Sequence, residues 1–272
     1  MGSVLLRFAI AAAVLLGAGA AIGSRLGSAF TPDGVPGPVD PYLVAPGTLR
    51  PSAPPSPSGT APPATQAAGR PVASPGDKPA SATVPRTGTG RFTTASAAGP
   101  VRGTAGPLHR YKVTVEVGSG QEPIEVAAII ESVLGDPRGW TANGSLRLQL
   151  VSGDADADFT VVLATPATSE AICATGGLRT EGYSSCRLPG RVVLNLARWL
   201  TAVPNYGAPL DEYRQYLVNH EVGHQLGHGH EACPGRGRPA PVMQQQTYGL
   251  NGCVANAWPY IGGKRYSGRA VK

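Results

Sequence analysis

The sequence has few charged and few aromatic residues. Of 272 residues, 15% are charged and 6% are aromatic, and there are only five His, four Cys and two Met. The one long apolar run lies near the N-terminus, from Phe8 to Ile22, which excludes a membrane protein with several spans. Residues 31–107 hold two aromatics but 17 of the 27 prolines. They cannot bury enough apolar surface to offset the entropy of ordering, which excludes a second globular domain.

Proline and glycine divide the chain into three parts. We predict a signal peptide or membrane anchor at 1–30, a disordered linker rich in Pro, Ala, Gly, Ser and Thr at 31–107, and one folded domain of about 165 residues at 108–272. Residues 108–272 carry 15 basic and 14 acidic residues, so we expect no nucleic-acid partner. We expect the basic residues near the C-terminus to form a solvated tail: Lys264, Arg265, Arg269 and Lys272.

The N-terminal segment predicts export. Arg7 precedes the apolar run Phe8–Ile22, whose fifteen residues suit a signal peptide better than a full span of about 20. Ala18-Gly19-Ala20 offers a cleavage site, whereas the run counted from Val4 favours an uncleaved anchor. Both alternatives place the rest of the chain outside the cytoplasm, secreted or anchored, with membrane contact only through this segment.

The folded part is predicted to be an α/β (α+β) sandwich. Alternating or continuous β-branched runs predict strands at 111–117, 146–151, 159–164 and 192–194. Apolar spacing predicts a packing helix at 123–134 and a second helix at about 210–226, with Asp211 as its N-cap. Glycine and proline dominate after Gly229, so we expect few regular elements there. The prediction is one mixed sheet, a packing helix and a helix that carries the chemistry.

That second helix ends in the stretch NHEVGHQLGHGH, residues 219–230. His220 and His224 are four residues apart, so they project from one helix face one turn apart. This spacing suits two imidazole ligands of one Zn²⁺ ion. Glu221, next to the first ligand, can reach a zinc-activated water and act as general base.

The end of this stretch supplies a third ligand. Gly227 is expected to stop the helix because glycine enters the left-handed region without penalty. The chain then doubles back, and His230 can offer a third nitrogen. Three protein ligands leave one position for water, which is the catalytic pattern of zinc sites. The intact Glu221 favours an enzyme as well, because a structural zinc needs no general base.

The motif residues resemble the extended zinc signature of the metzincin metallopeptidases, and Met243 in Pro-Val-Met-Gln looks like their Met-turn. NHEVGHQLGHGH and RPAPVMQQQT are also similar to an exported actinobacterial metzincin-like family whose function is not established. The resemblance implies a single zincin-like domain with a twisted mixed sheet and a minimal C-terminal subdomain. It implies a hydrophobic floor at Met243, a general base at Glu221, and zinc ligands at His220, His224 and His230.

Some positions depart from that family. Gln245 stands where some metzincins place a zinc-linked Tyr two residues after the Met, and we expect ordinary loop packing for Tyr248. His228 is not at a ligand position and is expected at the surface or beside the ligands. No Cys precedes Cys173, which excludes a cysteine-switch propeptide.

These observations favour an exported zinc-dependent endopeptidase that acts as a monomer on a peptide or protein substrate, with the cell envelope as one source of it. Two alternatives stay open. One is a zinc-stabilised envelope or binding module without catalysis. The other is a zinc amidase that acts on cell-wall peptide and shares the same chemistry.

Four cysteines in an exported chain allow three disulfide pairings. Cys173 and Cys186 flank a Gly-rich loop, while Cys233 and Cys253 lie on either side of Met243. We predict pairing of Cys173 with Cys186 and of Cys233 with Cys253, each worth about 3 kcal/mol by chain entropy. The rival possibility is that Cys233 ligates zinc.

Export is testable by gene fusion. We expect alkaline phosphatase joined after Ser28 to be active in a bacterial host, because the apolar run carries the attached domain across the membrane. The enzyme assay on whole cells measures this, and a β-galactosidase fusion at the same junction is the control. Strong β-galactosidase activity with inactive phosphatase would contradict export.

Overall fold

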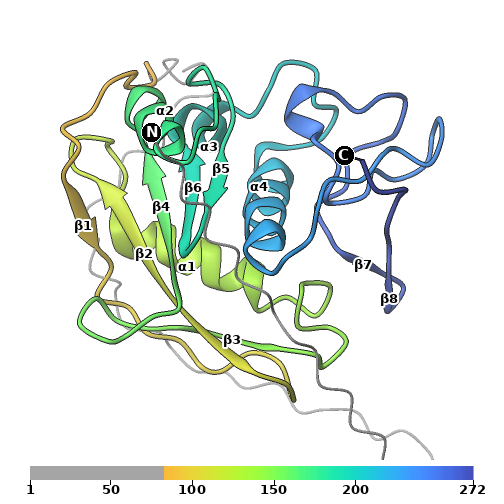
Figure 1. Ribbon diagram of the computed structural model, residues 1–272, viewed down its shortest axis with the longest axis horizontal. Helices are drawn as coiled ribbons and strands as arrows, with labels where there is room; N and C mark the ends of the chain where they lie inside the picture. Colours follow the sequence, from red (N-terminus) through yellow and green to blue (C-terminus); the bar gives the residue numbers. More distant parts are fainter. Residues whose placement is uncertain (1–82, 272) are drawn as a thin grey trace, which may run out of the picture. The chain divides into compact units, whose positions relative to one another are not determined.

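The computed structural model describes residues 83–271 (Figure 1). The predicted export segment and most of the predicted linker lie outside the described residues. A six-stranded mixed sheet forms the centre, in the order β1-β2-β4-β6-β5, with β3 also paired to β2. Its strands are β1 (Phe92–Thr94), β2 (Leu108–Glu116), β3 (Arg147–Leu150), β4 (Phe159–Ala164), β5 (Cys186–Leu188) and β6 (Arg191–Asn195). Strand β2 is parallel to β3 and β4, and β4 to β6, whereas β1 and β5 are antiparallel to their neighbours.

Four helices pack on the sheet: α1 (Pro123–Leu134), α2 (Pro166–Ala174), α3 (Leu196–Thr201) and α4 (Leu210–Gln225). Helices α1 and α4 cover one face, where alternate strand residues such as Val113, Val161 and Leu194 join them in the main core. Helix α2 covers the opposite face, where Val193 packs with Cys173. The sandwich of helices on a mixed sheet confirms the α/β (α+β) class.

The predicted elements are present. Helix α1 and strand β4 have the predicted bounds, and β2, β3, β6 and α4 differ by a few residues. Helices α2 and α3 were not foreseen, because α2 buries only three residues and shows no apolar stripe, while α3 has six residues. Asp211 is not the N-cap of α4; Pro209 holds that position, and Asp211 in the first turn pairs with Arg214.

The predicted linker boundary at 107 is wrong, because residues 83–107 belong to the folded unit. Phe92–Thr94 pair with β2, Ala95 is buried and donates its amide to Val113, and Arg102 exchanges backbone hydrogen bonds with Leu148. A strand can join a sheet edge through backbone groups alone. The linker was predicted from the lack of apolar side chains, and this criterion does not detect a segment that is held by its backbone.

A buried carboxylate fastens this N-terminal segment. Glu116 is 1% exposed and accepts hydrogen bonds from the amides of Gly90 and Thr165 and from the Thr168 hydroxyl, at 2.7–2.8 Å. Burial acts to raise the pKa of Glu116, but these hydrogen bonds outweigh it and lower the pKa below its usual value. The Glu116 carboxylate at the end of β2 thus joins the N-terminal segment to the start of α2.

The C-terminal region has little regular structure, as predicted. After α4 it contains the 3₁₀ turn η1 (Gln246–Tyr248) and a short hairpin of β7 (Tyr260–Ile261) and β8 (Lys264–Arg265). The expected solvated tail is wrong for Arg265, which pairs with Glu231 at 2.8 Å. No helix within residues 83–271 is long and apolar enough to span a bilayer.

Candidate metal centre

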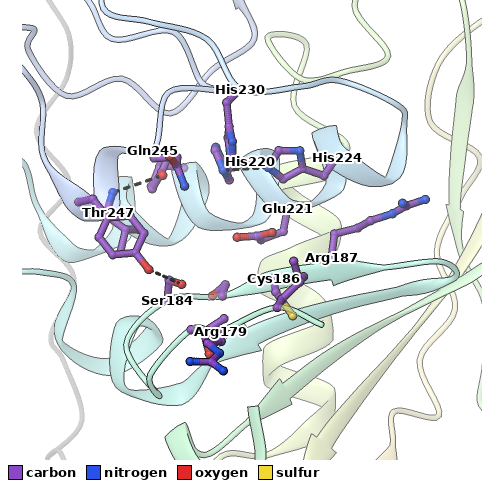
Figure 2. Close-up of a pocket in the computed structure, with 15 residues that line it drawn as sticks. Arg179, Ser184, Cys186, Arg187, His220, Glu221, His224, His230, Gln245 and Thr247 are labelled. Atoms are coloured by element: carbon purple, nitrogen blue, oxygen red, sulfur yellow. Dashed lines mark hydrogen bonds between the residues drawn. The ribbon is translucent and has the colours of Figure 1, made fainter. Parts of the chain in front are cut away.

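Helix α4 presents His220 and His224 on one face, as their spacing predicts (Figure 2). The helix ends where Gly227 adopts a φ of +92°, a left-handed conformation that favours glycine. The His228 amide donates to the Gly223 carbonyl at 2.9 Å, so the chain folds back tightly. This reversal brings His230 beside the two helical histidines.

The three imidazoles converge through their Nε2 atoms. Nε2 of His224 lies 3.2 Å from Nε2 of His220 and 3.1 Å from Nε2 of His230. Two nitrogens bound to one tetrahedral Zn²⁺ lie about 3.4 Å apart, given Zn–N bonds of about 2.0–2.1 Å. The separations therefore fit a shared ion.

The tautomers of two histidines are set by backbone carbonyls. Nδ1 of His220 lies 2.8 Å from the Val242 oxygen, and Nδ1 of His224 lies 2.8 Å from the His228 oxygen. A carbonyl only accepts, so each Nδ1 donates and each neutral ring keeps a lone pair on Nε2. These lone pairs face each other at 3.2 Å and cannot bond to each other. A cation between them satisfies both, so the donor set fits Zn²⁺.

Burial keeps the three rings neutral. His220 is 4% exposed, and burial, aided by the neighbouring histidines, lowers its pKa to about 3. Burial is also the main cause that lowers the pKa of His224 and of His230. Neutral imidazole is the form that ligates metal, so no proton has to be removed before an ion binds.

Glu221 lies beside the histidines with its carboxylate in the same cleft (Figure 2). Its side chain is 5% exposed, and burial raises its pKa to about 8. Neither carboxylate oxygen bonds to another residue in the part of the chain that the structure describes. A nearby metal cation would lower this pKa again, because it favours the charged form. Glu221 is thus a buried carboxyl that forms no hydrogen bond with another described residue and opens into the cleft of the histidines.

Met243 forms a fully buried floor under α4. The helix approaches it at Gly223, where a Cβ atom would overlap the Met243 sulfur and lie 2.6 Å from Trp140. The preceding carbonyl, that of Val242, is the one that holds His220. Met243 therefore packs against α4 next to the residue that holds His220, and the close approach at Gly223 was not found from the sequence.

Two residues expected near the site have defined positions. His228 stacks on Trp140 with ring centres 4.3 Å apart, so it is a neighbour of the three histidines as expected. Tyr248 is 59% exposed and lines the cleft, where its hydroxyl donates to Ser184 Oγ at 2.9 Å. Loop packing does not describe Tyr248, since it links two walls of the cleft.

The cleft has a volume of about 320 Å³. One wall comes from α4 and another from Gln245, Thr247 and Tyr248. The third wall is the loop after α2 and the strand β5, and sequence reasoning missed it. Its lining residues are Leu178, Arg179, Thr180, Ser184, Ser185, Cys186 and Arg187.

Two disulfides hold the irregular walls. Cys173 pairs with Cys186 and Cys233 pairs with Cys253, as the sequence predicts. The possibility that Cys233 ligates a metal is therefore wrong. Disulfides are typical of proteins that fold outside the cytoplasm, which agrees with an extracytoplasmic location.

The two disulfides hold different walls of the cleft, which gives a test. Cys233–Cys253 closes a loop that contains Met243, so we expect Cys253→Ser to weaken zinc retention. Cys186→Ser opens the bridge between α2 and β5, whose loop contains neither the histidines nor Met243, and is the matched control with a similar loss of about 3 kcal/mol in stability. Zinc retained against a chelator series measures the effect. Equal retention in both variants would contradict the assigned role.

Comparison with known proteins assigns the chain to a family. None of the curated proteins and none of the solved structures compared with it matches. The family model described as "Protein of unknown function (DUF3152)" matches residues 78–257. This match covers well over half of the chain and spans the sheet, the three histidines and Met243. The chain therefore belongs to the DUF3152 family.

Proposed function

We propose that this domain is an extracytoplasmic zinc-dependent peptidase. The observation that carries the proposal is the pair of Nε2 lone pairs on His220 and His224, which face each other at 3.2 Å with His230 alongside. The adjacent buried Glu221 opens into the same cleft. A ligand cluster and an unpartnered carboxylate in one cleft are the parts that hydrolysis requires.

The ligand count supports catalysis over a structural ion. Within residues 83–271, the cluster suited to a metal consists of three histidines, without a fourth His, Cys, Asp or Glu. Structural zinc sites are usually closed by four protein ligands, whereas catalytic sites keep one position open. When bound, zinc supplies Lewis-acid activation of water and of a substrate carbonyl.

The protein groups act on protons and on orientation. Glu221 accepts a proton from the attacking water and returns it to the leaving amine. Burial alone raises the pKa of Glu221, and a bound cation would lower it again toward the charged form that accepts a proton. The carbonyls of Val242 and His228 keep the two helical rings in one tautomer and one orientation. Tyr248 and Ser184 border the space where a peptide would lie.

The arrangement also supports a metzincin-like fold as part of the proposal. It has a mixed sheet, a helix with two of the histidines, a glycine turn before the third and a buried methionine below them. The described part after the motif has little regular structure and is held by a disulfide, which suits a minimal C-terminal subdomain. Export by the N-terminal segment, as a secreted or anchored form, completes the proposal.

The proposal predicts separate effects for ligand and base. We expect about one Zn²⁺ per domain, lost in His224→Ala, because two nitrogens cannot fill a site for three. Glu221→Gln should keep the zinc and lose about 10²- to 10⁴-fold in peptide hydrolysis, since the amide cannot accept the proton. Elemental analysis and mass spectrometry of a digested peptide library measure the two effects.

The matched control is His109→Ala, a histidine on β2 outside the cleft. It should leave zinc content and hydrolysis unchanged. Wild-type protein without zinc after purification and zinc addition would refute the metal site. Full hydrolysis by Glu221→Gln would refute the role of the base while leaving the metal site intact.

A further inference from the structure

The third wall of the cleft, residues 178–188, carries two arginines that line the same cleft as the histidines. Arg179 comes from the loop after α2 and Arg187 from the edge strand β5, and both line the same cleft as His224 and Glu221 (Figure 2). Figure 2 shows the Arg187 side chain extended along α4 toward the end of that helix. Arg179 is exposed and Arg187 is half-buried.

Neither arginine has an acidic partner among the described residues. Arg187 Nε donates to the neutral amide oxygen of Gln225 at 3.0 Å, which leaves both of its terminal nitrogens without a hydrogen bond to residues 83–271. Arg179 makes no side-chain hydrogen bond within the same range. Four other arginines in this range form ion pairs with carboxylates, namely Arg102, Arg138, Arg214 and Arg265.

A third guanidinium lies behind the same wall. Arg198, on α3, is 9% exposed and packs 4.5 Å from the ring of Tyr183. Its Nε and Nη1 atoms are buried without an acceptor in the described part of the chain. Tyr183 in turn packs against the cleft residue Tyr248, with ring centres 5.7 Å apart. A buried guanidinium without a carboxylate is costly, and its charge adds to the positive potential of this wall.

Among the described residues no acidic group pairs with Arg179 or Arg187, although the exposed Glu181 lies in the wall itself. Glu170 under the loop is held by the Thr180 hydroxyl and by the amides of Thr180 and Gly182. Glu221 is the one carboxylate among the residues that line the cleft. A bound divalent cation would add positive charge to the cleft, which would favour a ligand that carries negative charge.

We propose that the cleft takes peptides with carboxylate side chains beside the cleaved bond, and that Arg179 and Arg187 bind these carboxylates. The inference rests on the proposed peptidase function and names its substrate class. A guanidinium matches a carboxylate in two parallel hydrogen bonds, and it remains charged at every physiological pH. A neutral or basic peptide leaves both guanidiniums unpaired in the cleft, which disfavours it.

The test uses pairs of labelled peptides that differ only in Glu against Gln near the cleaved bond. The zinc-loaded wild-type domain should cleave the Glu member with about tenfold higher kcat/KM, the size expected for a charged hydrogen bond. Arg179→Gln with Arg187→Gln should abolish this preference while keeping cleavage of the Gln member. Arg110→Gln, an exposed arginine at the far end of β2, is the control and should retain it.

A charge-reversal variant distinguishes the loss of a specific ion pair from the loss of folded structure. Arg187→Glu should prefer a Lys-containing peptide over the Glu peptide, an outcome that mere loss of structure does not produce. Rising salt should reduce both preferences, because screening weakens exposed ion pairs. Equal cleavage of Glu and Gln peptides by wild type, or a preference that persists in the double Gln variant, would overturn the proposal.

Binding separates this proposal from the peptidase function. Fluorescence anisotropy with the Glu221→Gln variant reports affinity without turnover. Arginine-dependent binding of the Glu peptide, with no cleavage by wild type, would support the anion-binding cleft and refute the peptidase. Cleavage without any charge preference would support the peptidase function and refute the anion-binding cleft. Tighter arginine-dependent binding of a labelled oligonucleotide than of the Glu peptide would overturn the assignment to peptides.

Discussion

Two backbone carbonyls determine what this site can be. The oxygens of Val242 and His228 each take the Nδ1 proton of a helical histidine, at 2.8 Å. Each ring must then direct a lone pair toward its neighbour. If either carbonyl were displaced, the ring could change its tautomer and bond to the other histidine, and the need for a cation would vanish. The fit of the three histidines to a metal ion therefore depends on the segments that hold these carbonyls.

Both carbonyls belong to a region with almost no regular structure. Side-chain amides there make the hydrogen bonds that a sheet would otherwise make. Gln246 donates to the Asn256 carbonyl at 2.8 Å, and Asn256 donates to the Ala240 carbonyl at 2.9 Å. Asn219 on α4 donates to the Ala257 carbonyl at 3.0 Å, which ties the region to the helix that carries the histidines. Buried backbone groups need partners, and these amides supply them without further strands.

The sequence was sufficient for features that depend on neighbours along the chain. Helical periodicity places His220 and His224 on one face, a positive φ suits Gly227, and four cysteines in an exported chain pair in one of three ways. It was insufficient where the N-terminal segment meets the sheet. Strand β1 is held through its backbone and through Glu116, so its polar and proline-rich surroundings predicted a linker. Helix α2 lacks an apolar stripe because it rests on the sheet through only three buried residues.

The third wall of the cleft was missed for a topological reason. Its two arginines lie more than thirty positions before the histidines in the chain. They reach the cleft only because β5 is the antiparallel edge strand next to β6 and in contact with α4. No local pattern encodes that edge position. The order of the strands in the sheet, and not the separation along the sequence, decides which charged residues share a cleft with the three histidines.

Each of the two disulfides holds one wall of the cleft. Cys173–Cys186 joins α2 to β5 and so holds the strand that carries Arg187. Cys233–Cys253 closes the loop that contains Met243, whose neighbour Val242 orients His220. The wall formed by α4 is instead fixed by apolar packing in the main core. The described residues after α4 contain little regular structure, so the covalent links do part of the positioning that further helices or strands would otherwise do.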